Sequence, residues 1–268
     1  MEKIEKGFVI LDKPAGMTSF EACDAVRKKL KAEKAGHAGT LDPNVTGILL
    51  IALNKATKLM PLFEKLDKTY EGKARLHKEV SLKKLREVIK EKFTGTIKQI
   101  PPRKSRVKRI ERERKIYEFR ILKKQGKDFL FRVACEAGTY IRKLIHDLGV
   151  TLGVGAHMTS LKRIRQGPLT IREAVTLDNV NEKKVIEVEK LIARVSPIIY
   201  VTKSGSEKLK KGQFLFANEI EKIEGKFERE QIVAAFFDKE VIALVKPFFD
   251  SENIKKQKGY VLKPERVI

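Results

Sequence analysis

The sequence has few of the features that mark secreted, membrane-spanning or metal-binding proteins. It contains only two cysteines, Cys23 and Cys135, which lie far apart and match no paired spacing for a metal site. No apolar run approaches the roughly 18 residues of a membrane span, and the N-terminus has no apolar signal region. The cysteines suit a reducing compartment, although the sequence does not decide whether they form a disulfide with each other. We therefore expect a soluble, cytoplasmic protein without a membrane segment.

Charge is the most unusual property of the composition. The 268-residue chain carries 58 lysines and arginines against 35 aspartates and glutamates, which gives a net charge of +23. Its hydrophobic content of 42% is that of a globular protein with a substantial core. Heat adaptation would explain abundant lysine and glutamate but not an imbalance between the signs. The imbalance indicates a polyanionic partner, for which RNA or DNA is the usual candidate.

A single carboxylate stands in a turn-rich segment directly before an apolar one. Residues 36–49 read G-H-A-G-T-L-D-P-N-V-T-G-I-L, and the apolar run continues to Leu53. Pro43 disfavours helical backbone at Asp42, and the glycines allow turns that other residues resist. Such a loop can present a carboxylate at the surface while the apolar run anchors it in a core. An ordinary Asx-type turn is the alternative interpretation of the Asp-Pro pair alone.

Local patterns predict short strands and amphipathic helices along the chain. Alternating or continuous apolar residues predict strands, and capping residues before a helical repeat predict helix starts. The predicted elements are a strand at Phe8–Leu11, a helix from the Thr18/Glu21 capping box to about Lys31, a helix at Ser81–Phe93, a hairpin of Glu118–Leu122 with Phe129–Cys135, a helix from Thr139, a helix through Val185–Leu191, and a hairpin of Gln231–Phe237 with Val241–Val245.

Five stretches of the sequence resemble motifs of one enzyme family. The string G-H-A-G-T-L-D-P-x-x-T-G-x-L resembles the signature loop of TruB/dyskerin-type pseudouridine synthases. Further matches are D-K-P-x-G-x-T-S at 12–19, G-T-Y-I-R at 138–142 and G-V-G-A-H-M-x-x-L-x-R-x-R-x-G-P at 153–168. The cation-rich segment after Gln99 matches the family's Q-x-P-P-x-x-S-x-x-K pattern. The nearly continuous first match is far more specific than a single short motif.

The resemblance assigns roles to individual residues. It implies that Asp42 is the catalytic nucleophile, that Arg142 pairs with it, and that Tyr70 packs against the target base and is a candidate proton acceptor. The pairing makes physical sense, because an adjacent guanidinium keeps a carboxylate ionised and fixes its orientation. No metal or cofactor is expected. The residues that we expect to contact the base or the RNA are His37, Lys58, Arg103, Arg106, Tyr140, Leu161, Arg163 and Arg165.

The resemblance also implies a fold in two parts. Residues 1–190 are expected to form an α+β catalytic domain, with a mixed, mainly antiparallel central sheet flanked by helices. Residues 191–268 are expected to form a small β-barrel like the RNA-binding PUA domain. Ala217 and Asn218 stand where that domain usually has proline and glycine, which puts the RNA contacts of this edge in question.

Three functions follow from these observations. The leading one is an RNA-guided pseudouridine synthase of an H/ACA ribonucleoprotein, which modifies uridines of rRNA or tRNA. Its partners would be a guide RNA, the substrate RNA and small companion proteins, including a kink-turn-binding protein. The first alternative is a stand-alone enzyme acting on the T-loop of tRNA. The second is a non-catalytic RNA-binding scaffold, which would have no need for Asp42, Tyr70 and Arg142 together.

Overall fold

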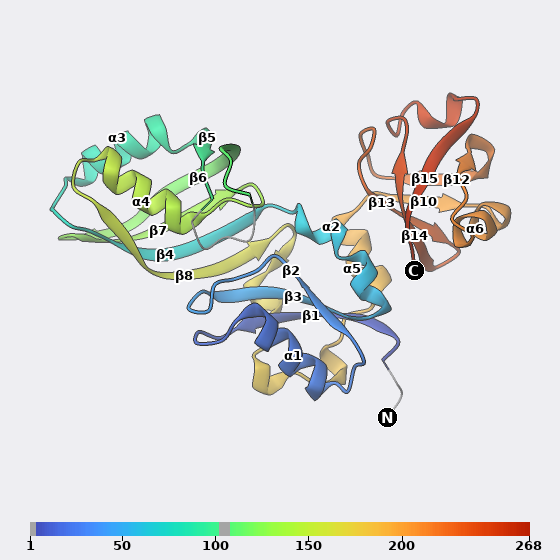
Figure 1. The fold of residues 1–268 in the computed structure, drawn as a ribbon, viewed down its shortest axis with the longest axis horizontal. Coiled ribbons are helices and arrows are strands. Elements are labelled where there is room, and N and C mark those ends of the chain that lie inside the picture. Colours follow the sequence, from blue (N-terminus) through green and yellow to red (C-terminus); the bar gives the residue numbers. More distant parts are fainter. Residues whose placement is uncertain (1–3, 102–107) are drawn as a thin grey trace.

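A large, mostly antiparallel sheet forms the body of the molecule. The computed structural model describes residues 4–101 and 108–268. The sheet order is β1-β3-β8-β4-β7-β6-β5, with β2 paired to β3 and β9 paired to β8 (Figure 1). Among its described pairs only β3 with β8 is parallel. The strands are β1 (Lys6–Lys13), β2 (Ala35–Ala38), β3 (Thr46–Asn54), β4 (Lys68–Leu76), β5 (Gly95–Gln99), β6 (Arg112–Gln125), β7 (Asp128–Cys135), β8 (Ala156–Gln166) and β9 (Leu169–Thr170).

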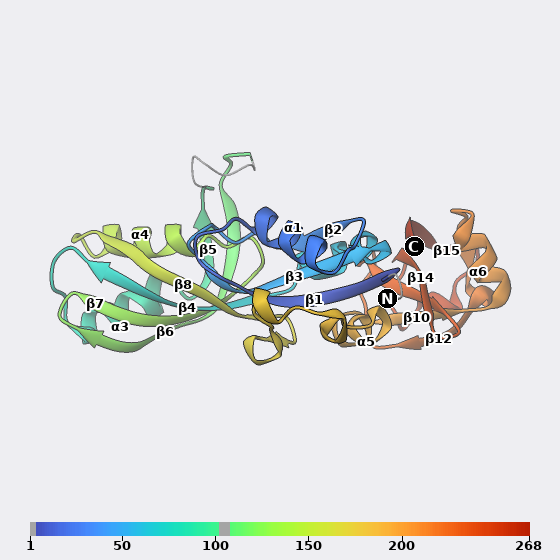
Figure 2. The ribbon, with the colours of Figure 1, turned by 90° about the horizontal axis from the view of Figure 1, so that it is seen from below.

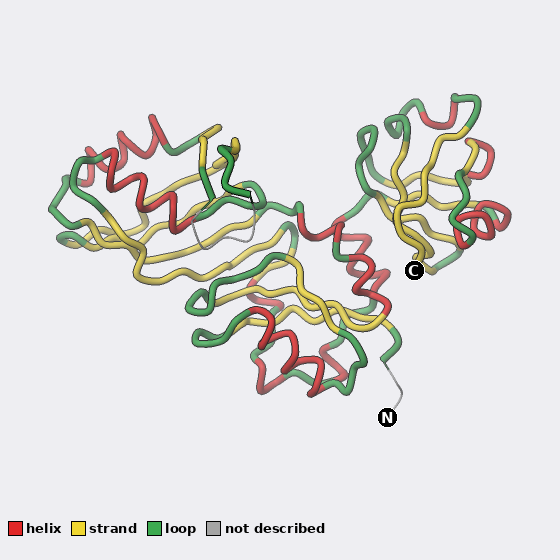
Figure 3. The backbone as a smooth tube through the Cα atoms, in the orientation of Figure 1, coloured by secondary structure: helices red, strands yellow, loops and turns green. Residues whose placement is uncertain are grey.

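The helices are short and flank the sheets (Figure 3). Two of them, α3 and α4, pack on the same face of the β4–β8 half of the sheet, where their apolar side chains join those of β4, β6 and β7 in one core. Helix α1 covers the β1–β3 half and contributes to a separate apolar cluster. The helices are α1 (Ser19–Lys29), α2 (Pro61–Glu64), α3 (Leu82–Lys92), α4 (Ile141–Thr151), α5 (Val188–Val195) and α6 (Lys203–Lys210).

The predicted helix starts are confirmed at two caps. Thr18 and Glu21 form a complete capping box at the start of α1, and Ser81 accepts a hydrogen bond from the Lys84 amide at the start of α3. The predicted loop of the β6–β7 hairpin is wrong in length. Strand β6 extends to Gln125, and the two strands pair up to the Gln125–Asp128 position, so the turn is far tighter than residues 123–128.

A second sheet of six strands follows α5. Its order is β11-β15-β14-β13-β10-β12, and Figure 2 shows it at one end of the long axis, beyond the large sheet. An apolar cluster that includes Phe8, Phe63, Ile192 and Phe236 joins the β1–β3 region to this second sheet through α5. The strands are β10 (Ile198–Val201), β11 (Leu215–Phe216), β12 (Ile220–Glu224), β13 (Val233–Phe237), β14 (Glu240–Pro247) and β15 (Tyr260–Val267).

The segment between the two sheets follows β1 rather than forming one long helix. Val175 and Ile186 make isolated bridges to Leu11 and Phe8, and three 3-10 turns lie between residues 171 and 184. The helix predicted from residue 185 begins only at 188 and continues to 195, so the predicted domain boundary after residue 190 falls inside α5. The predicted α+β fold class is confirmed. None of the described helices combines the length and apolar character needed to cross a membrane.

Candidate active site

Asp42 lies in the loop between β2 and β3. The flanking side chains of Leu41 and Val45 are buried in the core beneath α3 and α4, so the loop is anchored on both sides of the carboxylate. The Val45 amide donates a hydrogen bond to the Asp42 carbonyl at 3.0 Å, which closes a turn around the Asp-Pro pair. The Asp42 side chain is 52% exposed. The loop is therefore a tight turn that also presents a carboxylate to solvent.

Two buried polar side chains of the N-terminal motif hold this loop. Ser19 Oγ donates to the Leu41 carbonyl at 3.0 Å and accepts from the Leu41 amide at 2.8 Å. Lys13 is fully buried, and its Nζ donates to the carbonyls of Pro43, Pro14 and Met17 at 2.7–3.0 Å. Burial lowers the pKa of the Lys13 ammonium, while the nearby Asp42 carboxylate opposes that shift. No local pattern in this motif indicates that it supports the Asp42 loop directly.

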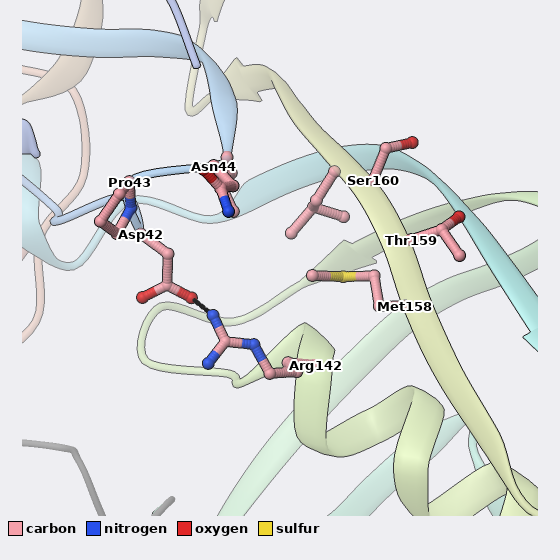
Figure 4. Close-up of a pocket in the computed structure, with 9 residues that line it drawn as sticks. Asp42, Pro43, Asn44, Arg142, Met158, Thr159 and Ser160 are labelled. Carbon is pink, nitrogen blue, oxygen red and sulfur yellow. Dashed lines mark hydrogen bonds and ion pairs between the residues drawn. The ribbon is translucent and has the colours of Figure 1, made fainter. Parts of the chain in front are cut away.

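Asp42 and Arg142 form an ion pair, although they are 100 residues apart in sequence. Figure 4 shows the guanidinium on α4 facing the carboxylate, and Arg142 Nη2 donates to Asp42 Oδ2. Arg142 lies in the first turn of α4, so the start of that helix sets its position. The predicted pairing is thus present in the structure, with 59% of the arginine side chain exposed. Such a pair keeps the carboxylate charged and oriented while leaving it accessible to a substrate.

A buried glutamine fixes the residue at which α4 begins. Gln99, at the end of β5, is 3% exposed. Its Oε1 accepts from the Tyr140 amide at 3.1 Å, and its Nε2 donates to the Tyr140 carbonyl at 3.3 Å. The side-chain amide thereby satisfies both backbone groups of the residue that precedes α4. In the sequence, Gln99 stands out only as part of a cation-rich motif. No local pattern indicates its contact with Tyr140, which is 41 residues away.

The ion pair stands at the edge of a pocket of about 320 Å³. This volume lies at the small end of the roughly 300–1,000 Å³ range of ligand pockets, which suits a single nucleobase better than a large ligand. Strand β8 supplies the opposite wall, with Met158, Thr159 and Ser160 in Figure 4 and Leu161 beside them. The structure thus places Leu161 in the pocket wall. The full lining consists of Asp42, Pro43, Asn44, Val45, Arg142, Met158, Thr159, Ser160 and Leu161.

Tyr70 lies beneath the pocket rather than in its wall. It is 9% exposed and packs in the same apolar cluster as Leu41, Val45 and Leu161. The guanidinium of Arg163 lies close to its hydroxyl and interacts with it electrostatically. Burial raises the pKa of the Tyr70 phenol, and Arg163 opposes that shift in part. Tyr70 is therefore a neutral phenol at neutral pH, close to Asp42 but below the surface that a base would first meet.

The prediction that Arg163 contacts RNA is wrong. Its side chain is buried at 1% exposure, and its donors are directed to the Ile48 and Gly39 carbonyls at 2.7 and 2.8 Å. A bulge explains the error: Tyr70 pairs with Arg163 while Thr69 pairs with Arg165, which leaves an extra residue in β8. The two arginines therefore do not share a face, as strict alternation would require. Arg165 is exposed, in keeping with the role predicted for it.

The remaining predicted contacts are spread more widely. His37 is half-buried on β2, and burial together with the Arg163 cation lowers the pKa of its imidazole. Lys58 is exposed in the 3-10 turn after β3, at the far end of that strand from the Asp42 loop, so it does not support that loop. Tyr140 is half-buried at the start of α4. Arg103 and Arg106 lie outside the described residues.

Both cysteines are free and buried, so the disulfide left open by the sequence is absent. Burial raises the pKa of the Cys23 thiol to about 11 and that of Cys135 to about 12, which makes both poor nucleophiles. In the described part of the chain, no three His, Cys, Asp or Glu side chains gather as metal ligands. The absence of a cofactor from the reaction stays a prediction.

The fold and the site together define a class of enzyme. A mainly antiparallel sheet presents one carboxylate, fixed by an arginine, beside a base-sized pocket on a chain of net charge +23. This is the arrangement that the sequence motifs imply for an enzyme that modifies a nucleobase in RNA.

Comparison with known proteins identifies the family. Residues 27–141 match the N-terminal domain of TruB family pseudouridylate synthases, and residues 142–199 match the C-terminal domain of tRNA pseudouridylate synthase B. The chain is 40% identical to the "Probable tRNA pseudouridine synthase B" of Pyrobaculum calidifontis, over 100% of this chain and 85% of the relative. It therefore belongs to the TruB family and is a pseudouridine synthase, an isomerase.

Solved structures resemble the chain over nearly its whole length. A crystal structure of a Cbf5-Nop10-Gar1 complex contains a chain with 38% identity and a TM-score of 0.90, covering 98% of this chain and 85% of that one. The structure of an H/ACA RNP bound to a substrate RNA containing 2'-deoxyuridine contains one with 37% identity and a TM-score of 0.84, covering 97% and 84%. These similarities include both sheets.

Proposed function

We propose that this pseudouridine synthase modifies uridines of folded rRNA or tRNA under the direction of an H/ACA-type guide RNA. The observation that carries the chemistry is the exposed Asp42–Arg142 pair at the edge of a base-sized pocket. The guided mode is supported by the similar chains in the Cbf5-Nop10-Gar1 complex and in the substrate-bound H/ACA RNP, which this chain matches over at least 97% of its length.

In this proposal, each residue of the site has a separate role. Asp42 is the nucleophile, which attacks either the ribose or the uracil ring and frees the base for rotation before the new carbon–carbon bond forms. Arg142 holds that carboxylate ionised and aimed at the pocket. Leu161 and the neighbouring β8 residues confine the detached base. Because a base in folded RNA must leave its stack to reach Asp42, the target nucleotide is flipped into the pocket.

The rest of the chain serves RNA binding and assembly in this proposal. The six-stranded C-terminal domain, separated near residue 190, acts as a PUA-like RNA-binding module. Arg165, His37 and Tyr140 contribute contacts near the substrate, Lys58 contacts RNA farther from Asp42, and the segment that contains Arg103 and Arg106 contacts phosphates. Small companion proteins, including a kink-turn-binding protein, complete the particle, which works in the cytoplasm.

Stand-alone action on tRNA is a second candidate function. It is favoured by the curated relatives, several of which are named as probable tRNA pseudouridine synthase B. The same catalytic site serves both modes, so the modes differ in how the RNA is brought to Asp42. A non-catalytic scaffold is disfavoured, because Asp42 and Arg142 are paired and accessible.

The two modes separate in one experiment. Purified protein is incubated with a tRNA transcript, or with an rRNA fragment plus guide RNA and companion proteins, and pseudouridine is mapped by sequence position. Guided action predicts product at the guide-specified uridine only when guide and companions are present. Product in tRNA by the protein alone, unchanged by guide or companions, would instead establish the stand-alone mode. RNA bound without any product under either condition would establish the scaffold.

A further inference from the structure

Arg163 is a buried cation that the chemistry described above does not use. It is one of the largest fully buried side chains of the protein, and among the described residues no carboxylate lies within ion-pair distance of it. An unpaired buried charge is expensive unless hydrogen bonds satisfy it. Arg163 donates to two main-chain carbonyls, and the Tyr70 hydroxyl is a third polar neighbour of its guanidinium.

The first two groups lie on either side of Asp42. Arg163 Nη2 donates to the Gly39 carbonyl at 2.8 Å, and Nε donates to the Ile48 carbonyl at 2.7 Å. Gly39 precedes Asp42 by three residues and Ile48 follows it by six, so one guanidinium joins both ends of the loop. The fixed fork of arginine can hold two carbonyls at once, whereas the single nitrogen of lysine cannot reproduce that geometry.

The third group is the hydroxyl of Tyr70, which lies close to the same guanidinium and interacts with it electrostatically. The backbone of Arg163 also lies between the two elements concerned, because it pairs with Tyr70 on β4 and with Gly47 on β3. Gly47 has a φ of +101°, and a Cβ there would lie 2.2 Å from the Arg163 carbonyl oxygen. Strand β3 therefore approaches Arg163 so closely that only glycine fits.

We infer that Arg163 is a positioning residue for the pseudouridine reaction, which holds the Asp42 loop and the Tyr70 hydroxyl in one rigid unit. It acts through these two groups and does not touch RNA. Misplacement of a reacting group by about 1 Å can reduce a rate about 100-fold. A guanidinium that fixes the positions of these groups therefore affects the rate of the chemical step. The inference rests on the proposed role of Asp42 and on the role of candidate proton acceptor that the sequence motifs imply for Tyr70.

The test compares Arg163→Lys and Arg163→Met with Arg75→Met, an exposed arginine on β4 outside the site. Single-turnover rates are measured at saturating RNA, under whichever guide condition supports wild-type product, and corrected for the folded fraction. We expect Arg163→Met to slow product formation about 100-fold, with RNA affinity within about twofold of wild type, as for a residue without RNA contact. Arg163→Lys keeps the charge and is expected to fold and to be slowed less.

A merely structural role would not produce coupling to Tyr70. In a Tyr70→Phe background, Arg163→Lys should cost at least about threefold less in rate than it does in wild type, because its third partner is already gone. Additive costs would overturn the inference, as would a normal rate at saturating RNA with weakened affinity. Either result leaves the proposed function intact if Asp42→Asn is inactive.

A measurement that does not depend on turnover distinguishes failure of this inference from failure of the proposed function. Hydrogen exchange should accelerate in Arg163→Lys and stay unchanged in Arg75→Met at two amides, that of Leu41, which donates to Ser19 Oγ, and that of Val45, which donates to the Asp42 carbonyl. Unchanged protection in Arg163→Lys would overturn the inference even if the wild-type enzyme made no product with any RNA tested.

Discussion

The two sheets of this protein bury charge in opposite ways. The catalytic half buries three cations, Lys13, Lys68 and Arg163, and each donates to main-chain carbonyls. Within the described residues, none of the three has a carboxylate at ion-pair distance. The C-terminal half buries one carboxylate, Glu219, and pairs it with Lys208 at 2.7 Å. One half therefore leaves its buried charges uncompensated, and the other neutralises its own.

The difference lies in what the buried charges contact: in the catalytic half two of the three contact a functional loop, and in the C-terminal half the buried carboxylate contacts a local turn of the fold. Lys13 and Arg163 donate to the carbonyls of Pro43, Gly39 and Ile48, all in or beside the Asp42 loop. Glu219 instead accepts from the Phe216 amide and Ser204, and so closes a local turn of the C-terminal domain. Two of the three buried cations of the catalytic half thus hold the loop that carries Asp42, whereas Lys68 donates to the Glu64 carbonyl.

Removal of the nucleophile should give the largest effect. Asp42→Asn is expected to reduce product formation by about 10⁴-fold or more, because an amide cannot act as a carboxylate nucleophile. RNA affinity should stay close to wild type. Single-turnover pseudouridine formation and a binding titration measure the two quantities. The matched control is Asp128→Asn, whose 58% exposed carboxylate pairs with Arg75 elsewhere on the sheet. Retained turnover in Asp42→Asn would remove Asp42 from the catalytic role.

Replacement of the arginine partner should give the second largest effect. Arg142→Lys keeps the charge but loses the fork that orients the carboxylate, so we expect a rate loss of about 100-fold. The control Arg75→Lys changes a pair of similar exposure, at 51% and 58%, and should leave the rate unaffected. The comparison is made by single-turnover kinetics at saturating RNA. Equal rates in the two variants would show that orientation by Arg142 contributes nothing.

The sequence predicted the exposed part of the site better than the part beneath it. Asp42, Arg142 and Leu161 stand in motifs, and the structure brings them together at one pocket. Arg163 was misplaced because a single extra residue in β8 changes which side chains point inward. Gln99 was missed as a contact of Tyr140 because no local pattern reports a partner 41 residues away.

The same distinction applies to the fold. Capping boxes and periodicity located α1 and α3 because the information is local to each helix. The start of α5 and the path of residues 171–187 depend instead on bridges to β1, which no local pattern encodes. Tertiary contact decides those segments, so their prediction from the sequence was the least accurate.

The uncompensated cations should make the catalytic half more stable at alkaline pH. Burial lowers the pKa of Lys68 from 10.5 to about 8. Between these values the unfolded chain binds more protons than the folded one, so this lysine's contribution to unfolding free energy rises with pH. Relative to Lys68→Met, wild type should gain up to about 3 kcal/mol from pH 8 to 10.5 in urea unfolding. Lys73→Met, an exposed lysine on the same strand, is the control, and a flat difference for Lys68→Met would contradict the burial cost.

The paired carboxylate of the C-terminal half should show its pH dependence in the acidic range instead of the alkaline one, and its effect should be the smallest. Burial works to raise the pKa of Glu219, but the hydrogen bonds from Lys208 and the Phe216 amide outweigh it, and the net pKa lies below its usual value. Its contribution to stability is therefore present above the unfolded pKa of about 4.5 and is lost as the pH falls through the lower folded value.

Glu219→Gln should accordingly cost about 1 kcal/mol of unfolding free energy at pH 7, since one charge-assisted hydrogen bond is weakened while the others can persist. The gap to wild type should close as the pH falls below that range, measured by urea unfolding. Glu221→Gln, on the exposed face of β12, should show no such gap. Glu219→Gln could instead lose as much unfolding free energy at pH 7 as the change expected for Lys68. The contrast between the halves would then disappear, because a paired buried charge would be as costly to disturb as an unpaired one.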